Sequence, residues 1–477
     1  MESKNWIGGE WYAPTSETMV ISSPSDISVD VGVLHFSDES DVIAAGDAAR
    51  KALPSWADQP PMARGDILYR AAALLEQQLE EIAVLASSEM GKPITEMKGE
   101  VMRGVNLLKY YAAEGARAVG QVIPASQTQV LQYTSRVPLG VVAIITPWNF
   151  PVAIPIWKIA PALICGNTVI WKPAENASLS ATRIAQVFAD AGVPAGVLNV
   201  VIGRGPELGG ALFEKTTLDG VSFTGSTNTG MHVAAMAAAR NIKYQTEMGG
   251  KNAAVVLADA DLSVAVPAIL SGAFRSAGQK CTATSRVIVE ATIYDAFLTA
   301  LTDQLKDVYT GSALDPRSYL GPVASRQQFK KVQSYVKLAE TNAKRLHRGQ
   351  LNAEAEGYYV QPLVIEGVDR DSPLVTDEIF GPVMALLPAS GFDEAVQLSN
   401  QTVYGLSASV FTQNIHHALR FLNESEAGMV RVNLESAGVE YQAPFGGMKA
   451  SSSHSREQGQ AALDFYTQTK TCAIYYG

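Results

Sequence analysis

The sequence has few of the residues that build disulfide frameworks and metal sites. Its 477 residues include only three cysteines and six histidines. The cysteines, at positions 165, 281 and 472, are an odd number and far apart, which argues against a disulfide framework and for reduced thiols. His416 and His417 are adjacent, so on a helix they point about 100° apart and cannot converge on one ion. We therefore expect no metal site.

Long apolar runs and an excess of positive charge are also missing. No run is long enough to span a bilayer, and the polar start at 1–6 lacks the basic-then-apolar pattern of a secretory signal. A net charge of −10 disfavours binding to nucleic acid or to an anionic membrane, although it leaves room for a local basic pocket. We expect a cytoplasmic protein with neither of these partners.

The composition is that of a globular protein, with 47% hydrophobic and 18% charged residues. The length is too great for one compact core and predicts two or three domains. Residues 5–35 alternate around glycines and prolines, which predicts a hairpin-rich start. Apolar residues at helical spacing then predict helices over 38–51, 61–88 and 94–118. Strand-like spacing follows over 121–137.

From Gly140 to Gly250 apolar strands alternate with helices, a pattern typical of a parallel sheet with crossover helices. We expect these strands at 141–146, 168–172, 197–202 and 220–223. A second series follows Gly250, with strands expected at 253–257 and 285–290. The sequence therefore predicts an α/β fold.

The stretch Gly278–Arg286 presents Cys281 among small and polar residues rather than inside an apolar run. A reactive thiol needs access and neighbours that favour the thiolate, here Lys280 and the local backbone amides. Taken alone, an inert cysteine that acts as a small hydrophobic residue is the commoner case. Cys281 is thus a candidate nucleophile that needs support from other motifs.

Three further motifs supply that support: Asn149 in Thr-Pro-Trp-Asn-Phe-Pro, Glu247 in Glu-Met-Gly-Gly-Lys and Glu378 in Glu-Ile-Phe-Gly-Pro. With Cys281, and in this order, they resemble the aldehyde dehydrogenase superfamily from about residue 5 to the C-terminus. The resemblance implies two Rossmann-like α/β domains plus a small oligomerisation sheet. Its expected divisions are an NAD-binding domain over 1–118 and 139–249, a catalytic domain over 250–459, and an oligomerisation sheet over 119–138 and 460–477. Pairing of 121–137 with 465–476 in that sheet implies a homodimer or homotetramer.

The resemblance also implies roles in aldehyde oxidation. Cys281 would attack the carbonyl carbon, and the Asn149 amide with the Cys281 N–H would hold the oxyanion. After hydride transfer, Glu247 would deprotonate the water that hydrolyses the thioester. Because a carboxyl group of pKa about 4.3 is a weak base, we expect burial to raise the pKa of Glu247.

A second set of positions would hold the dinucleotide. Gly225 and Ser226 follow a strand and precede a helix, so their turn presents free amides to an anion, although such turns are more often ordinary helix entries. In the resembled family the serine of this turn touches the pyrophosphate. The other implied cofactor residues are Thr146, Trp148, Lys172, Glu175, Gly205, Glu378 and Phe380. Without the resemblance, the alternatives are solvated charges at Lys172 and Glu175, a loop carboxylate at 378 and a core aromatic at 380.

Glu175 bears on the choice between NAD and NADP. A carboxylate accepts hydrogen bonds from a free 2′-hydroxyl but repels a 2′-phosphate, by at most about 4 kcal/mol at about 4 Å and an effective dielectric constant of about 20. We predict NAD.

The substrate wall carries an arginine, Arg275, six residues before Cys281, where many family members have an aromatic residue. Arginine can clamp a distal carboxylate, and the alternative is a helix-face arginine paired to an acid. The segment 432–441 resembles the subgroup that oxidises 2-oxoglutarate semialdehyde. The other expected wall positions are Arg103, Ile154, Trp157 and Phe445. The run 152–157, however, is apolar where certain semialdehyde enzymes carry a second arginine, so aromatic or long-chain aldehydes are the alternative substrates.

Three rival activities stay open. A CoA-acylating enzyme would pass the acyl group to CoA, and the presence of Glu247 argues against it. A non-catalytic structural or binding protein has no reason to combine Cys281, Asn149 and Glu247. A thiol esterase would need no dinucleotide site at Glu175.

Overall fold

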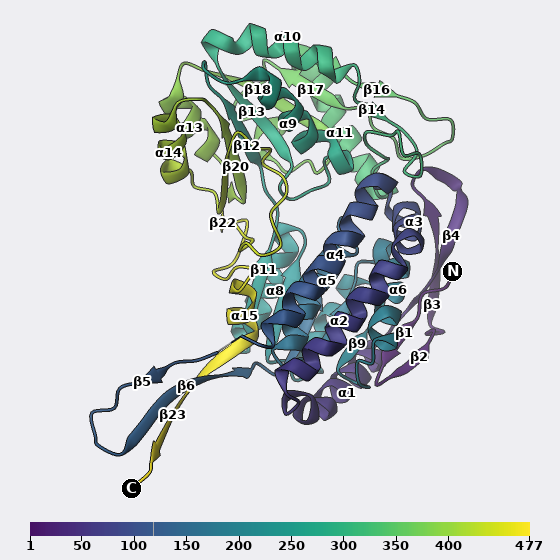
Figure 1. Cartoon of the computed structure of the whole chain (residues 1–477). Coiled ribbons are helices and arrows are strands. Elements are labelled where there is room, and N and C mark those ends of the chain that lie inside the picture. The colour runs from purple at the N-terminus through teal and green to yellow at the C-terminus, as the bar shows by residue number, and fades with distance from the viewer. Residues whose placement is uncertain (118) are drawn as a thin grey trace.

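Two α/β lobes and a projecting arm make up the structure, a computed structural model that describes residues 1–117 and 119–477 (Figure 1). Each lobe is built on a seven-stranded sheet. The arm carries strands from the middle and from the C-terminal end of the chain, and it points away from both lobes. The predicted α/β class is confirmed.

The first sheet is mixed rather than wholly parallel. Its strands, in spatial order, are β11 (Lys243–Glu247), β10 (Gly220–Thr224), β7 (Val141–Ile145), β8 (Thr168–Lys172), β9 (Leu198–Val200), β1 (Asn5–Ile7) and β2 (Glu10–Tyr12). The first five run parallel, as predicted, whereas β1 and β2 are antiparallel additions at the edge. The parallel pattern predicted for 140–250 is therefore confirmed, and β1 and β2 belong to the segment predicted to be hairpin-rich, where Gly8 and Gly9 at φ 61° and 92° reverse the chain into a hairpin that continues the sheet.

Helices surround this sheet. They are α1 (Glu39–Ala57), α2 (Pro61–Gln77), α3 (Leu79–Met90), α4 (Ile94–Glu114), α5 (Ala153–Ile164), α6 (Ser178–Asp190), α7 (Gly205–Glu214) and α8 (Thr227–Ala239), with a 3₁₀ turn at Glu175–Ala177. The single helix expected over 61–88 is two helices, because Gln78 leaves helical geometry at φ −99° and ψ 12° and redirects α3. The helix expected to reach residue 118 ends at Glu114, and Ala118 itself lies outside the described residues.

The second sheet is also mixed. Its strands, in spatial order, are β15 (Arg345–Arg348), β17 (Leu363–Glu366), β18 (Val383–Ala389), β13 (Thr284–Glu290), β12 (Asn252–Val256), β20 (Ser407–Phe411) and β21 (Met429–Val432), of which only β15 is antiparallel to its neighbour. Its helical segments are α9 (Leu262–Phe274), α10 (Tyr294–Leu305), α11 (Arg326–Asn342), α12 (Pro373–Thr376), α13 (Phe392–Asn400) and α14 (Ile415–Glu424), with 3₁₀ turns at Arg275–Gly278 and Ala291–Ile293. The chain changes sheet between Glu247 and Asn252. The exact domain limits stay a prediction.

Short pairs complete the fold. They are β3 (Glu17–Ser23) with β4 (Asp26–Phe36), β14 (Tyr309–Thr310) with β16 (Gln350–Leu351), and β19 (Tyr404–Gly405) with β22 (Met448–Lys449). Across the described ranges, no helix is long and apolar enough to cross a membrane. The three cysteines are unpaired. The cytoplasmic location stays a prediction.

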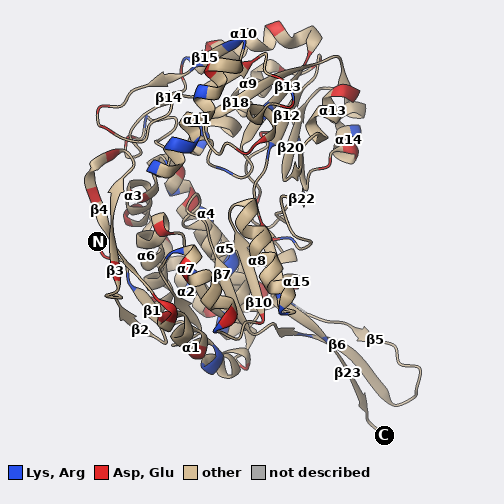
Figure 2. Ribbon diagram, turned by 180° about the vertical axis from the view of Figure 1, so that it is seen from behind, with Lys and Arg blue, Asp and Glu red and all other residues tan. Residues whose placement is uncertain are grey.

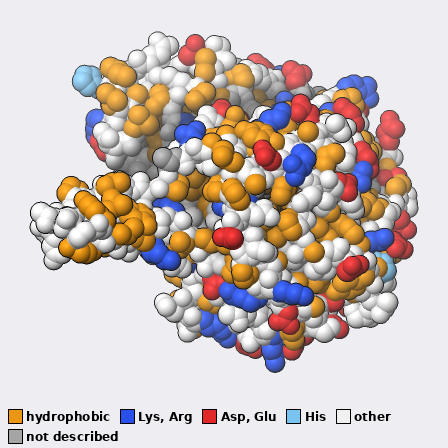
Figure 3. Space-filling model, turned by 60° about the horizontal axis from the view of Figure 1, so that its bottom comes forward, with side chains coloured by type: hydrophobic (Ala, Val, Ile, Leu, Met, Phe, Trp, Pro, Cys, Tyr) orange, Lys and Arg blue, Asp and Glu red, His pale blue; other side chains and the backbone are white. Residues whose placement is uncertain are grey.

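The arm is a three-stranded sheet of β5 (Val122–Ile123), β6 (Val130–Pro138) and β23 (Thr467–Tyr475), which α15 (Ala461–Tyr466) joins to the first lobe. β23 pairs antiparallel with β6 from Thr467 opposite Pro138 to Tyr475 opposite Val130, so the predicted pairing with the C-terminal segment is confirmed. Figure 2 shows few charged residues along the arm, and Figure 3 shows hydrophobic side chains gathered on it.

Candidate active site

The candidate site is a cavity with a volume of about 680 Å³, including the open space at its mouth. Part of its wall follows the carboxyl ends of β7 and β10. These neighbouring strands mark the place where the chain order of the first sheet reverses, and ligands of α/β sheets bind at such places. The rest of the wall comes from α5, from the loop after β11 and from the second lobe.

Eight of the predicted residues line this one cavity: Trp148, Asn149, Ile154, Gly225, Ser226, Cys281, Glu378 and Phe380. The sequence reasoning missed six others: Pro147, Thr224, Met248, Gly249, Gln328 and Lys331. Met248, Gly249 and Pro147 lie beside predicted motif residues. Gln328 and Lys331 are on α11 and belong to no motif, so no sequence signal singled them out.

The turn before Cys281 is fixed by backbone geometry. Ser276 and Ala277 have φ of 55° and 54°, and Gly278 follows at 67°. A Cβ on Gly278 would lie 2.3 Å from the Gly381 carbonyl oxygen, so only glycine fits. The Ser276 N–H and hydroxyl donate to Glu96 over 2.9 and 2.7 Å. This strained turn gives Cys281 a defined position at the cavity wall.

The Asn149 side chain is held beside the same loop. Its amide nitrogen donates to the Gln279 carbonyl oxygen over 2.9 Å, which leaves one amide hydrogen free. The buried Lys92 ammonium donates to the Asn149 carbonyl oxygen over 2.6 Å and pairs with Glu100. The amide therefore has little freedom to turn away from the cavity.

The Cys281 thiol is less acidic than the sequence suggested. Burial raises its pKa well above the usual value, and the charges of Glu378 and Glu247 raise it further. The backbone N–H groups of Cys281 and Thr282 act in the opposite direction, as expected. The expectation that Lys280 favours the thiolate is wrong, because its ammonium contacts the Ser271 carbonyl oxygen at 3.4 Å and does not outweigh burial.

Glu247, at the end of β11, lies behind the cavity wall and is 1% exposed. Burial raises the pKa of its carboxyl group well above the usual value, in the expected direction, and the charge of Glu457 adds to the effect. Glu457 was not predicted. It pairs with the buried Lys158 and accepts a hydrogen bond of 2.7 Å from the Trp157 indole nitrogen. Because Lys158 and Glu457 are 299 residues apart, the sequence offers no local signal for this pair.

The residues predicted for the adenosine half of the cofactor lie where β8 ends. The Lys172 ammonium is 3.4 Å from the Glu175 carboxylate, which also accepts a hydrogen bond of 3.0 Å from the Gly205 N–H. Lys172 is 6% exposed, so the alternative of a solvated surface lysine is wrong. Burial lowers the pKa of this lysine, and Glu175 opposes the shift. Nearby, the Thr146 hydroxyl accepts a bond of 2.9 Å from the Trp171 indole.

Ser226 caps the N-terminus of α8, where its side chain accepts from the Thr229 N–H at 3.4 Å. At the Cys281 end, the Glu378 carboxylate accepts a bond of 3.0 Å from the Gly250 N–H. A Cβ on Gly249 would lie 2.3 Å from that carboxylate. Phe380 has a left-handed φ of 59° and meets the Trp148 ring edge-to-face at 5.5 Å.

These groups fit a dinucleotide. Free amides and a helix N-terminus suit a pyrophosphate, and the carboxylates of Glu175 and Glu378 suit ribose hydroxyls at either end. Within 1–117 and 119–477, no cluster of three or more His, Cys, Asp or Glu could hold a metal ion.

The predicted substrate residues fall into two groups. Ile154 lines the cavity. Phe445 belongs to a hydrophobic cluster that Cys281 contacts, and its ring is tilted by 36° to the Trp157 ring at a centroid distance of 5.4 Å. Arg103 and Arg275 are not part of the cavity lining. The Arg103 guanidinium lies 6.0 Å from the Trp157 ring, and that of Arg275 lies 4.7 Å over Tyr319.

Comparison with known proteins agrees with this geometry. The model of the aldehyde dehydrogenase family matches residues 11–472. The chain belongs to the aldehyde dehydrogenase family. It is 48% identical to an alpha-ketoglutaric semialdehyde dehydrogenase of Bacillus subtilis, over 98% of this chain and 97% of that protein.

Solved structures of enzymes that are named for different cofactors share this fold. An NAD-dependent aldehyde dehydrogenase from Sinorhizobium meliloti superposes with a TM-score of 0.94 at 34% identity, covering 100% of this chain and 95% of the other. An NADP-dependent enzyme from E. coli superposes with a TM-score of 0.95 at 32% identity, covering 100% and 98%. The reaction is the NAD(P)-dependent oxidation of an aldehyde.

Proposed function

We propose that this enzyme oxidises an acid semialdehyde, such as 2-oxoglutarate semialdehyde, with NAD as the preferred acceptor. The Bacillus subtilis relative supports the substrate class. The observation that carries it is a pair of arginines, Arg103 and Arg275, with no carboxylate within 4.0 Å in the described part of the chain. An arginine without an acidic partner in a partly buried setting is suited to an anionic ligand.

The surroundings of Arg103 support this role further. Its Nη2 donates to the Gln458 Oε1 over 3.0 Å, and its buried Nε has no protein partner among the described residues. The Gln458 amide nitrogen is equally unpartnered in those ranges, and Gln458 is fully buried with a left-handed φ of 59°. Two buried donors without acceptors are costly, so a carboxylate that accepts from both would stabilise the site.

The chemistry divides among three residues. The Cys281 thiol loses its proton to solvent, and its sulfur then bonds to the carbonyl carbon; the new alkoxide accepts hydrogen bonds from the free Asn149 amide hydrogen and the Cys281 N–H. When bound, NAD supplies the acceptor for the hydride that leaves the same carbon. Glu247 then takes a proton from water, whose oxygen attacks the thioester carbon, and it returns that proton to the leaving sulfur, so that the acid and the Cys281 thiol are released.

The aldehyde preference tests the proposal. Initial rates of NADH formation with 2-oxoglutarate semialdehyde and with pentanal, which has the same chain length, give the two values of kcat/KM. We expect the acid aldehyde to be favoured. A preference for pentanal would instead support the aromatic or long-chain alternative, to which the Ile154, Trp157 and Phe445 wall is also suited.

NAD is proposed over NADP because of Glu175. The fold serves both cofactors, so the preference must come from local groups. The Glu175 carboxylate is fixed by Lys172 and by the Gly205 N–H. A 2′-phosphate bound at this end of the site would meet its negative charge.

Changing Glu175 to Gln is expected to raise the ratio of kcat/KM with NADP to that with NAD by about tenfold, because like-charge repulsion is removed. Steady-state rates with each cofactor measure the ratio. Glu207→Gln, an exposed change near the start of α7, is the matched control and should leave the ratio unchanged. A wild-type enzyme that already prefers NADP would contradict the role of Glu175.

The arm is proposed to join subunits into a homodimer or homotetramer. Val122, Ile474 and Tyr475 on it are 76%, 48% and 70% exposed, a concentration of apolar surface that a second copy of the chain would cover. Replacing Val122 and Ile474 together by Asp is expected to shift the sedimentation coefficient to that of a monomer. A monomeric wild type, or an unchanged variant assembly, would contradict this role of the arm.

A further inference from the structure

Ser452 contacts the carboxylate of Glu247 directly. Its hydroxyl donates to the Glu247 Oε2 over 2.5 Å, and the two residues also form an isolated antiparallel bridge. The Gly447 N–H donates to the same hydroxyl oxygen over 2.7 Å. Because the oxygen already accepts from a backbone N–H, the hydroxyl hydrogen is directed at the carboxylate.

The other carboxylate oxygen has no comparable contact. Glu247 Oε1 lacks a hydrogen-bond partner in the described ranges and faces Gly446, where a Cβ would lie 2.9 Å away. Ser452 is therefore the only hydrogen-bond donor found for this side chain among the described residues. It holds the carboxylate at the back of the cavity wall formed by Met248 and Gly249.

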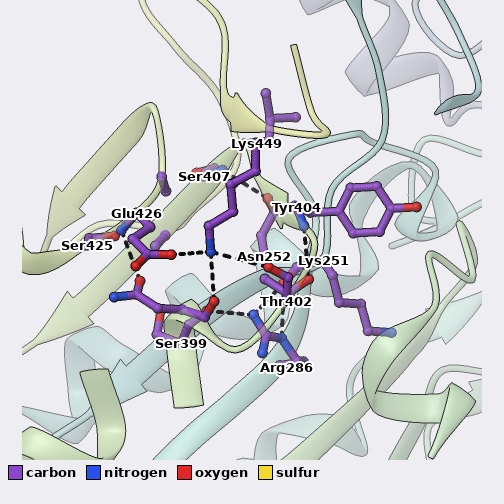
Figure 4. A pocket seen from close by; sticks show the side chains of 15 residues that line it. Lys251, Asn252, Arg286, Ser399, Thr402, Tyr404, Ser407, Ser425, Glu426 and Lys449 are labelled. Carbon is purple, nitrogen blue, oxygen red and sulfur yellow. Dashed lines mark hydrogen bonds and ion pairs between the residues drawn. The ribbon is translucent and has the colours of Figure 1, made fainter. Parts of the chain in front are cut away.

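The segment that carries Ser452 is itself anchored at both ends. Before it, the Lys449 ammonium donates to the carbonyl oxygens of Asn400 and Thr402 over 2.8 and 3.2 Å and pairs with Glu426 (Figure 4). After it, the Ser453 hydroxyl accepts from the Thr246 N–H over 2.8 Å. These contacts fix where the Ser452 hydroxyl can lie.

The neighbouring Ser451 ties the same segment to the loop after Glu247. Its hydroxyl donates to the Gly249 carbonyl oxygen over 2.7 Å, and its carbonyl oxygen accepts from the Met248 N–H over 2.7 Å. The segment is therefore tied directly to the loop that follows the base.

We propose that Ser452 is a positioning residue that orients the Glu247 carboxylate for proton abstraction from water. The inference rests on the proposed role of Glu247 as the base. It assigns to this chain a hydroxyl that acts through the carboxylate and does not touch the substrate.

The charges around Glu247 explain why one hydroxyl matters. Burial and the charge of Glu457 raise the pKa of Glu247. The charges of Lys158 on α5 and of Arg456, together with the Ser452 hydrogen bond, lower this pKa. The Cys281 thiol faces the Glu247 carboxylate from the cavity side. A hydrogen bond to the carboxylate favours its charged form, so loss of the hydroxyl raises the pKa further. Since the base acts when deprotonated, the acid limb of the hydrolysis step should move to higher pH.

The test is Ser452→Ala, with the rate of thioester hydrolysis measured in single turnovers from about pH 5 to about pH 9. We expect the acid limb to shift upward by about one pH unit, with slower hydrolysis above the limb because the carboxylate is no longer held in place, and an unchanged first turnover of NADH. Ser452→Thr keeps the hydroxyl and should restore the wild-type limb. Ser453→Ala is the matched control, because it removes a hydrogen bond from the same segment without touching the carboxylate.

The outcomes separate this inference from the role of Glu247. An unshifted limb in Ser452→Ala, or an equal shift in Ser453→Ala, would overturn the inference while Glu247→Gln still slows hydrolysis. If Glu247→Gln hydrolyses the thioester normally, the base itself is misassigned and the inference falls with it. If Ser452→Ala does not fold, Ser452→Gly removes the same hydroxyl, and the position of the acid limb of thioester hydrolysis is measured in that variant instead.

Discussion

Changing Cys281 to Ser is expected to lower kcat for aldehyde oxidation by about 10⁴-fold or more, the scale on which removal of a nucleophile acts in hydrolases. A serine hydroxyl near neutral pH is a far weaker nucleophile than a thiol. Steady-state NADH formation measures the loss.

NAD binding supplies the control for this variant. The groups proposed to hold the cofactor, Lys172, Glu175 and Ser226, do not depend on the thiol, so the dissociation constant from fluorescence titration should match the wild type. Cys165→Ser is the matched cysteine variant, because Cys165 ends α5 and is not part of the cavity lining; it should keep its activity. Normal turnover by Cys281→Ser would remove the cysteine from the mechanism.

The sequence predicted the α/β class, several strands and the residues at strand ends, because these depend on local patterns. Strand β8 matches its expected bounds, 168–172, and β23 pairs with β6 as the family resemblance implied. The edge hairpin of β1 and β2 was not assigned to the first sheet, since Gly8 and Gly9 predict a turn but not the strand that the hairpin joins.

The direction of a pKa shift in the site could be predicted from the sequence only where one cause determines it. Burial was expected to raise the pKa of Glu247, and it does. The prediction that Lys280 favours the Cys281 thiolate was wrong, because Lys280 is adjacent to Cys281 in the sequence but directs its ammonium group to the Ser271 carbonyl oxygen. Glu457 and Ser452 shape the same carboxylate from more than 200 residues away, and only the folded chain brings them to it.

The second large effect is expected from replacing Arg103 and Arg275, the two arginines that have no acidic partner among the described residues. A distal carboxylate would form charge-assisted hydrogen bonds, each worth about 1.5–3 kcal/mol, or roughly 10- to 150-fold in kcat/KM. Arg275→Leu and Arg103→Leu are each expected to penalise 2-oxoglutarate semialdehyde by that factor. Both arginines are connected to α4. Arg103 lies on this helix, and Ser276, the residue after Arg275, donates a hydrogen bond to Glu96 in the first turn of the helix.

Pentanal is the internal control in each variant, because an uncharged aldehyde loses no ion pair. Its kcat/KM should be unchanged or higher. Equal losses for both aldehydes, together with a lower thermal midpoint, would show that an arginine supports the fold rather than the substrate. If only one of the two variants has a lower kcat/KM for 2-oxoglutarate semialdehyde but not for pentanal, the arginine replaced in that variant binds the carboxylate. The free donors of Arg103 and Gln458 lead us to expect the larger penalty at position 103.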